Sequence, residues 1–169
     1  MPTLIDRRGP RADDWVVFGG DAGAVPSGAS VLLPLAEWRR AAAHWRAHAG
    51  RIGVLLAPSD DAAALAPDLG ELALVAVAFP SFTDGRGHST GRLLRERHGW
   101  RGELRAVGEV LRDQLFYLAR CGFDTFALAD GEDGAAAITA FADFGEVYQA
   151  GADRGPHFER RFAAGGARA

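Results

Sequence analysis

The chain has 169 residues, a mass of 17.9 kDa and 48% hydrophobic residues, which fits one domain with a sizeable core. A net charge of −3 and a pI near 5.9 provide no basic field, so we expect no nucleic-acid partner. The sequence shows no apolar run of about 18 residues and no apolar signal segment at its start. We therefore expect a cytoplasmic protein that does not contact a membrane.

Several kinds of covalent chemistry are excluded by residues that the sequence lacks. All 19 basic residues are arginine, which excludes Schiff-base catalysis and the lysine of a phosphate-binding loop. Cys121 is the only cysteine, so one chain forms neither a disulfide nor a thiolate metal cluster. Because Cys121 ends a predicted helix, where the dipole raises a thiol pKa, we expect a buried bystander and not a nucleophile.

Metal and cofactor signals are weak. His44 and His48 have helical spacing but no third ligand accompanies them, so we predict a solvated helix face and no metal site. No Gly-x-Gly-x-x-Gly motif follows a strand, which argues against a dinucleotide site. The four tryptophans could stack a flavin, although core packing is their default role. The cofactor is therefore unknown.

In chain order, residues 1–30 are a lead-in that we expect to be hairpin-like, with strands at Leu4–Ile5 and Trp15–Phe18. Apolar runs then alternate with helical patterns as far as residue 144. The predicted strands are Val31–Leu33, Ile52–Ala57, Leu72–Phe79, Glu103–Val107 and Phe123–Leu128. The predicted helices run from Pro34 to Gly50, Ser59 to Ala66 with Pro67 as the stop, Ser89 (the N-cap) to His98, Val110 to Arg120, and Ala135 to Phe144.

The pattern predicts a single α/β domain over residues 1–150 and a polar, flexible tail over 151–169. About five βα units imply a mainly parallel sheet with right-handed crossovers. In the fourth strand, Glu103 and Arg105 share one face while Leu104 and Ala106 share the other. Two folds explain this charged face: an open three-layer sheet with this strand at its edge, or half of a TIM-like barrel with a polar concave side. Two such halves could form a homodimer.

The strongest candidate site is the loop and helix start after the third strand, residues 79–89. Ligands of parallel α/β folds bind beyond the carboxyl ends of the strands, where this loop lies. Its glycines let backbone amides approach a ligand, and an arginine can grip a phosphate, sulfate or carboxylate. The alternative is a capped turn with a solvated arginine. The candidate ligand-binding residues are Ser81, Thr83, Gly85, Arg86, Gly87 and Ser89, with Asp84 as a candidate catalytic residue.

A second group of polar residues follows the next strand and is expected at the same edge of the sheet. Convergence of two neighbouring βα loops makes a small-anion site more credible than either loop alone. Arg105 could either pair with Asp84 or Asp113 or hold an anion. Asp84 or Asp113 could move a proton only if its pKa were raised. The ligand-binding residues predicted in this group are Arg105, Glu109, Arg112 and Gln114, and Asp113 is its candidate catalytic residue.

Motifs along most of the chain resemble a bacterial domain-of-unknown-function family. The likeness is densest between Phe79 and Leu128 and includes Asp14-Trp15 and Leu33-Pro-Leu35. The family pattern more often has Asp where this chain has Glu109. The motifs are Phe-Pro-Ser-Phe-Thr-Asp-Gly-Arg-Gly-His-Ser (79–89), Arg-Leu-Leu-Arg (92–95), Gly-Glu-Leu-Arg-Ala-Val-Gly (102–108), Arg-Asp-Gln-Leu-Phe-Tyr (112–117) and Arg-Cys-Gly-Phe-Asp (120–124).

Members of that family are labelled as oxidoreductases involved in sulfite reduction, because their genes lie near that of sulfite reductase. The resemblance therefore implies a pathway and not a reaction. It suggests an accessory protein or oxidoreductase of assimilatory sulfite reduction that acts with sulfite reductase as its partner. The alternative, which depends on the residues alone, is a small-molecule enzyme or sensor that binds a phosphate, sulfate or carboxylate at the C-terminal edge of the sheet.

Overall fold

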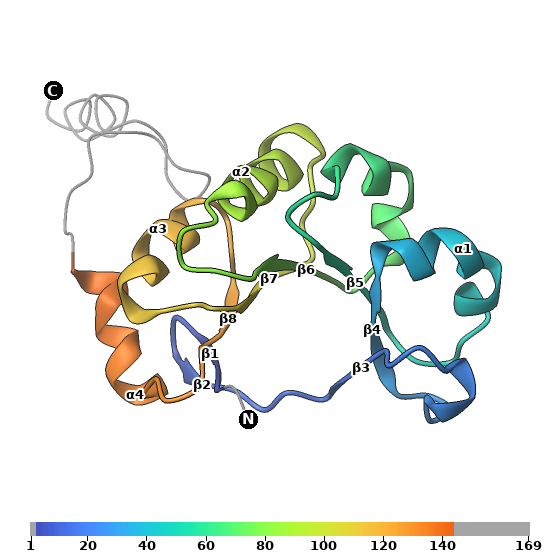
Figure 1. The fold of residues 1–169 in the computed structure, drawn as a ribbon, viewed down its shortest axis with the longest axis horizontal. Coiled ribbons are helices and arrows are strands. Elements are labelled where there is room, and N and C mark those ends of the chain that lie inside the picture. The colour runs from blue at the N-terminus through green and yellow to red at the C-terminus, as the bar shows by residue number, and fades with distance from the viewer. Residues whose placement is uncertain (1–2, 144–169) are drawn as a thin grey trace, which may run out of the picture.

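The computed structural model describes residues 3–143, which form one curled eight-stranded sheet with helices along its outer side (Figure 1). The strand order is β2-β1-β8-β7-β6-β5-β4-β3, parallel from β3 through β8, with β1 antiparallel to both β8 and β2. The strands are β1 (Leu4–Asp6), β2 (Gly9–Pro10), β3 (Trp15–Val17), β4 (Ser30–Pro34), β5 (Ile52–Leu56), β6 (Leu74–Phe79), β7 (Glu103–Gly108) and β8 (Thr125–Ala127).

The five predicted βα units are confirmed as β4 to β8, each followed by helical structure. Their continuous apolar runs suit strands buried in the interior of a parallel sheet. The α-helices are α1 (Leu35–Arg46), α2 (Arg86–Arg92), α3 (Leu115–Arg120) and α4 (Gly134–Ala137); a π-helical turn (Leu93–Arg97) extends α2, and 3-10 helices cover Ala22–Ala24, Ala62–Glu71, Arg112–Gln114 and Ile138–Ala142.

Two predicted helix boundaries are wrong. Ser89 is not an N-cap, because the Asp84 carboxylate accepts the Arg86 N–H (3.2 Å) and α2 begins three residues earlier, at Arg86. Pro67 does not end its helix, because this segment is a 3-10 helix that continues to Glu71. A proline has its φ preset for a first helical position, so a new turn can start there.

The sheet must curl because its two ends are tied together by a short connection. β2 and β3 lie at opposite ends of the strand order, yet only residues 11–14 join them. In a flat sheet, seven strand spacings would hold these edges about 34 Å apart, whereas the five Cα–Cα steps from Pro10 to Trp15 span at most about 18 Å. The lead-in is therefore more than a hairpin-like decoration. Its β1 and β2 form a hairpin at one edge of the sheet, and its β3 forms the other edge.

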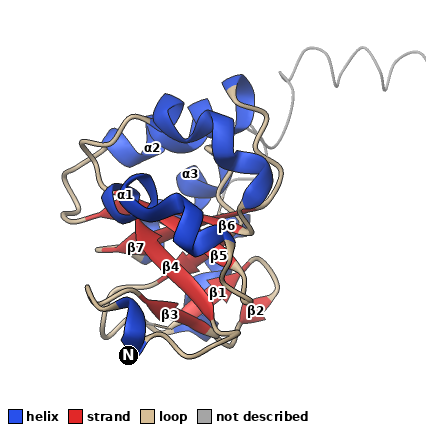
Figure 2. Cartoon of the chain, turned by 90° about the vertical axis from the view of Figure 1, so that its right-hand side faces the viewer, coloured by secondary structure: helices blue, strands red, loops and turns tan. Residues whose placement is uncertain are grey.

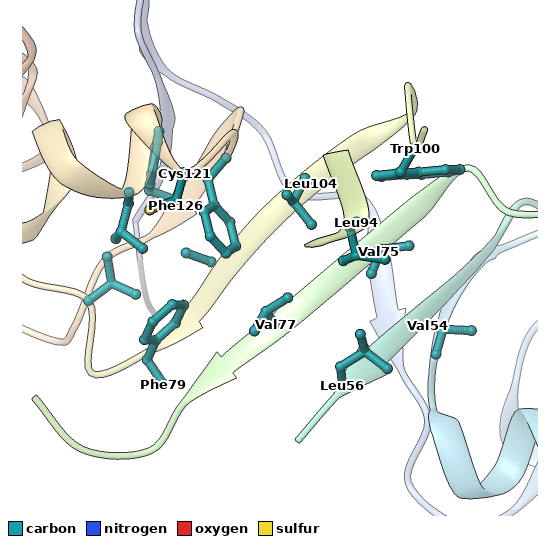
Figure 3. Packing of buried hydrophobic residues seen from close by; sticks show 14 of the residues in the cluster. Val54, Leu56, Val75, Val77, Phe79, Leu94, Trp100, Leu104, Cys121 and Phe126 are labelled. Atoms are coloured by element: carbon teal, nitrogen blue, oxygen red, sulfur yellow. The ribbon is translucent and has the colours of Figure 1, made fainter. Parts of the chain in front are cut away.

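Helices α1, α2 and α3 cover the convex face of this half-barrel (Figures 1 and 2). The strand side chains on that face form the main core with the helices, as Figure 3 shows around Val77, Phe79 and Phe126. In α2 the backbone passes very close to aromatic rings at two glycines. A Cβ on Gly87 would lie 2.6 Å from the Phe79 ring, and a Cβ on Gly91 would lie 2.4 Å from the Phe123 ring.

The alternation of charge in β7 is explained by the curled sheet. β7 lies between β6 and β8, so an edge strand in an open sheet is the wrong explanation. Leu104 and Ala106 point into the helix-covered core, while Arg105 lies on the concave face and is only 4% exposed. The half-barrel alternative is confirmed, although the sheet has eight strands among the described residues and not five.

Candidate functional site

The concave face of the half-barrel holds a pocket of about 370 Å³. Leu32 on β4, together with Leu74 and Ala76 on β6, forms a small core of its own on this face. Volumes of 300–1,000 Å³ with a mostly apolar lining and a few polar groups are typical of small-molecule sites. The apolar side chains that line the pocket include Trp15, Val17, Leu32, Leu55 and Val107.

A buried guanidinium lies at one side of this pocket. Arg105 donates to Glu103 Oε1 from Nε (3.1 Å) and Nη2 (2.9 Å), and from Nη1 to Asp13 Oδ1 (2.9 Å). The hydroxyl of Thr125 on β8 donates to the same Glu103 oxygen at 2.7 Å. Two strands and the N-terminal connection therefore converge on Arg105, and its charge is neutralised within the protein.

The N-terminal connection, residues 11–14, supplies one wall of the site. Asp13 belongs to this connection and lines the pocket beside Arg105. The next residue, Asp14, pairs with Arg51, and the Arg51 guanidinium also lies 5.0 Å from the centre of the Trp15 ring. These contacts fasten the connection to the body of the protein at two points.

The other polar part of the pocket lies at the C-terminal end of β7. Gly108 has φ +104°, and a Cβ there would lie 2.4 Å from the Phe79 carbonyl oxygen, so glycine is required. The Glu109 N–H donates to that same carbonyl at 2.7 Å, which fixes the turn. The Glu109 side chain lies at the pocket and is exposed to solvent.

The predicted loop is a self-contained turn. Arg86 makes a two-pronged ion pair with Asp84, at 2.9 Å from Nε and 2.7 Å from Nη2. The hydroxyls of Ser81 and Thr83 bond to each other at 3.1 Å. The charged groups of this loop are therefore already matched to each other, while the Arg86 side chain remains 64% exposed.

The electrostatics of the loop disfavour proton abstraction. The Arg86 guanidinium holds the pKa of the Asp84 carboxyl below its usual range, and a carboxylate with a lowered pKa is a weak base. Burial lowers the pKa of His88, which packs against the Phe79 ring (centroids 5.1 Å apart) and the Tyr117 ring (5.0 Å). His88 is thus neutral near pH 7.

The predicted second group divides among three places. Arg105 and Glu109 line the concave pocket. Gln114 meets the predicted loop, where its Nε2 lies 3.5 Å from the Phe82 carbonyl oxygen. Arg112 donates instead to Thr139 (3.0 Å) and Asp143 (3.1 Å).

Of the remaining candidates, Asp113, Gly85 and Ser89 are exposed to solvent, whereas Gly87 is buried against Phe79.

Four polar residues of the concave site were not singled out from the sequence as ligand-binding or catalytic: Asp13, Glu103, Thr125 and Asp130. Glu103 was noted only for its face, and its pairing with Thr125 spans 22 residues. Asp13 lies 92 residues from Arg105 in the chain. The one local signal was Asp13-Asp14 directly before an apolar strand, which places carboxylates at a strand end.

The remaining chemical candidates lie in the core or at the ends of helices. Trp38, Trp45 and Trp100 are buried in the helix-side core, whereas Trp15 lies on the concave face. Cys121 is 1% exposed and burial raises its thiol pKa, as expected for a bystander. His44 is exposed on α1, as predicted. His48 is not on the same solvated helix face, because it follows the end of α1 and its partly buried Nε2 lies 2.8 Å from the Ala29 carbonyl oxygen. Within residues 3–143, no three His, Cys, Asp or Glu side chains are grouped to hold a metal.

Residues 53–158, which include most of β5, all of β6 to β8 and the C-terminal edge of the pocket, match the family described as "Bacterial protein of unknown function (DUF934)". The chain belongs to this family. No curated protein matches the DUF934 chain. Over residues 3–143, each helix is too short or too polar to cross a membrane.

Proposed function

We propose that this DUF934 protein binds a small molecule on the concave face of its half-barrel, at the C-terminal ends of the parallel strands. The main observation that supports this proposal is the pocket of about 370 Å³. It lies on the face of the sheet that α1, α2 and α3 leave uncovered (Figure 1). Ligand sites of parallel α/β folds lie at this end of the strands. The proposal retains the edge predicted from the sequence but moves the ligand from the 79–89 loop to the concave face.

The polar groups of the loop and the pocket suit the binding of a ligand better than acid–base catalysis. Asp84, a predicted proton carrier, has a pKa lowered by Arg86. Arg105 is held by Glu103 and Asp13 and so has a fixed position. Among the described residues, these two carboxylates accept three of the five guanidinium N–H bonds, which leaves two donors for a ligand or for water. A preorganised donor beside apolar side chains supports recognition of a specific small molecule.

Filling the pocket with a larger side chain tests the proposal. Small fragments are screened by ligand-observed NMR against the wild type, Val107→Trp and Leu93→Trp. Val107 lines the pocket, whereas Leu93 is 42% exposed on the helical side of the molecule. We expect fragments that bind the wild type to lose most of their affinity for Val107→Trp and to retain it for Leu93→Trp. Equal binding to all three proteins would contradict the proposal.

The second candidate function is an accessory role in assimilatory sulfite reduction, with sulfite reductase as the partner. The resemblance described above supports the pathway, and an exposed aromatic surface in the same part of the chain supports protein binding. Phe82 is 52% exposed and Tyr117 is 54% exposed, and aromatic side chains are enriched at protein interfaces. Purified protein should bind sulfite reductase or change its turnover, and Tyr117→Ala should weaken that effect. A reductase that neither binds the protein nor responds to it would overturn this candidate.

A further inference from the structure

The charged groups at the concave pocket are unequal in number. Arg105 contributes one positive charge, and Glu103 and Asp13, which bond to it, contribute two negative charges. Glu109, at the C-terminal end of β7, and Asp130, which follows β8, add two further carboxylates to the lining of the pocket. Because Arg105 is already compensated, the field left for a ligand is negative. An anion would be repelled there, whereas a cation would be attracted.

The apolar and charged groups also differ in their exposure to solvent. Leu32, Leu55 and Val107 form an apolar floor, whereas Glu109 is exposed and Asp13 is 44% exposed at the side chain. A ligand that followed this arrangement would lay an apolar body on the floor and keep its charged group near the carboxylates, partly in water. A cation that stays partly hydrated avoids most of the cost of burying a charge.

We propose that the ligand of this pocket is a small organic cation, with an amine or similar positive group on an apolar body. This inference rests on the proposed function, since it assigns the chemical class of the molecule bound at the same site. A volume of about 370 Å³ lies near the lower end for ligand pockets and suits a molecule of one or two rings. Complementary charge sets the specificity, and the apolar floor supplies much of the affinity.

Three compounds of similar size and different charge test the inference on the full chain. 2-Phenylethylamine is a cation, 3-phenylpropanoate an anion and 2-phenylethanol neutral, and all three carry the same ring. Dissociation constants come from ligand-observed NMR titrations at low salt. We expect the amine to bind at least about fivefold more tightly than the carboxylate, the size of one partly exposed charge interaction. The alcohol should lie between them.

Removing one carboxylate tests whether Glu109 causes this preference. Glu109→Gln should reduce the ratio between amine and carboxylate binding severalfold. Glu96→Gln is the matched control, because Glu96 pairs with Arg92 on the helical side and does not line the pocket. An equal change in both variants would overturn the assignment to this pocket.

The outcomes separate this inference from the proposed function. If the carboxylate or the alcohol binds more tightly than the amine, and Val107→Trp abolishes that binding, the pocket binds small molecules but the cation assignment is wrong. If none of the three compounds binds at millimolar concentration, this inference and its basis in the proposed function both fail. Amine binding that is lost in Val107→Trp and weakened in Glu109→Gln supports both.

Discussion

The two faces of the sheet are built from the same strands but serve different purposes. On the convex face, helices bury nearly every strand side chain, and the core there runs from α1 to the 3-10 helix at Ile138–Ala142. On the concave face, only a few side chains are fully buried, and Arg105 is among them. The convex face therefore supplies most of the stability, whereas the concave face leaves part of its apolar and charged groups open to solvent at the pocket.

Truncation of one large side chain on each face should give the largest difference. Phe126 is fully buried on the convex side and contacts Phe141, with ring centroids 5.2 Å apart. We expect Phe126→Ala to lower the free energy of unfolding by about 3–5 kcal/mol, because a cavity is added to the lost burial. Val107→Ala, on the half-buried concave face, should cost about 1 kcal/mol. Urea denaturation measures both values, and similar costs would show that the two faces are not distinct.

Two arginines offer the next comparison, since the sequence predicted both as ligand-binding residues. Arg105→Met removes the partner of Glu103 and Asp13 and should cost about 2–3 kcal/mol, because carboxylates lose a buried counter-charge. Arg86→Met breaks an exposed pair and should cost less than about 1 kcal/mol. Thermal or urea unfolding gives both numbers. A cost for Arg86→Met as large as that for Arg105→Met would contradict the assignment of Arg105 to a buried network.

Two glycines at the same edge of the sheet should respond differently to alanine. Gly108→Ala places a Cβ on a residue with positive φ and 2.4 Å from a backbone oxygen, which should cost about 2 kcal/mol. Gly85→Ala has φ −81° and its nearest contact at 4.0 Å, so stability should change by less than about 0.5 kcal/mol. If both variants are equally stable, the backbone at residue 108 does not require glycine, and the tight turn before Glu109 is wrongly described.

The smallest expected effect is a pH dependence from His88. Burial lowers its pKa, so the unfolded chain takes up a proton before the folded protein does as the pH falls. The contribution of His88 to the free energy of unfolding is therefore fully present above the unfolded pKa of about 6.5. It is lost as the pH falls from that value through the lower pKa of the folded protein. His88→Gln should flatten this part of the stability profile, which urea unfolding at several pH values measures. An NMR-measured pKa of His88 above 6.5 would reverse the sign and contradict the prediction.

The sequence predicted the local parts of the fold but not the pairing at its edges. Continuous apolar runs identified β4 to β8, because strands buried on a parallel sheet need apolar residues at most positions. The curl depends on where Leu4–Asp6 and Trp15–Val17 pair, and periodicity carries no information about such distant contacts. Within these strands, the alternation of Glu103 and Arg105 was a local sign of a polar concave face.

The candidate site was predictable to a similar degree. Glu109 directly follows the carboxyl end of a parallel strand, as predicted, whereas Arg105 lies in the middle of β7; both line the concave pocket. The predicted association of these two residues with the 79–89 loop is wrong, because Asp84 and Arg86 satisfy each other within that loop. Asp13 became a partner of Arg105 only through the curl of the sheet.

Ligand binding followed at individual methyl groups tests the central claim most directly. Wild-type protein with labelled leucine and valine methyls is titrated with 2-phenylethylamine. We expect the methyl chemical shifts of Leu32, Leu55 and Val107 on the concave face to change. Those of Val75 and Leu104 on the convex face should change little. Shifts confined to the convex face, or to residues 81–89, would contradict it.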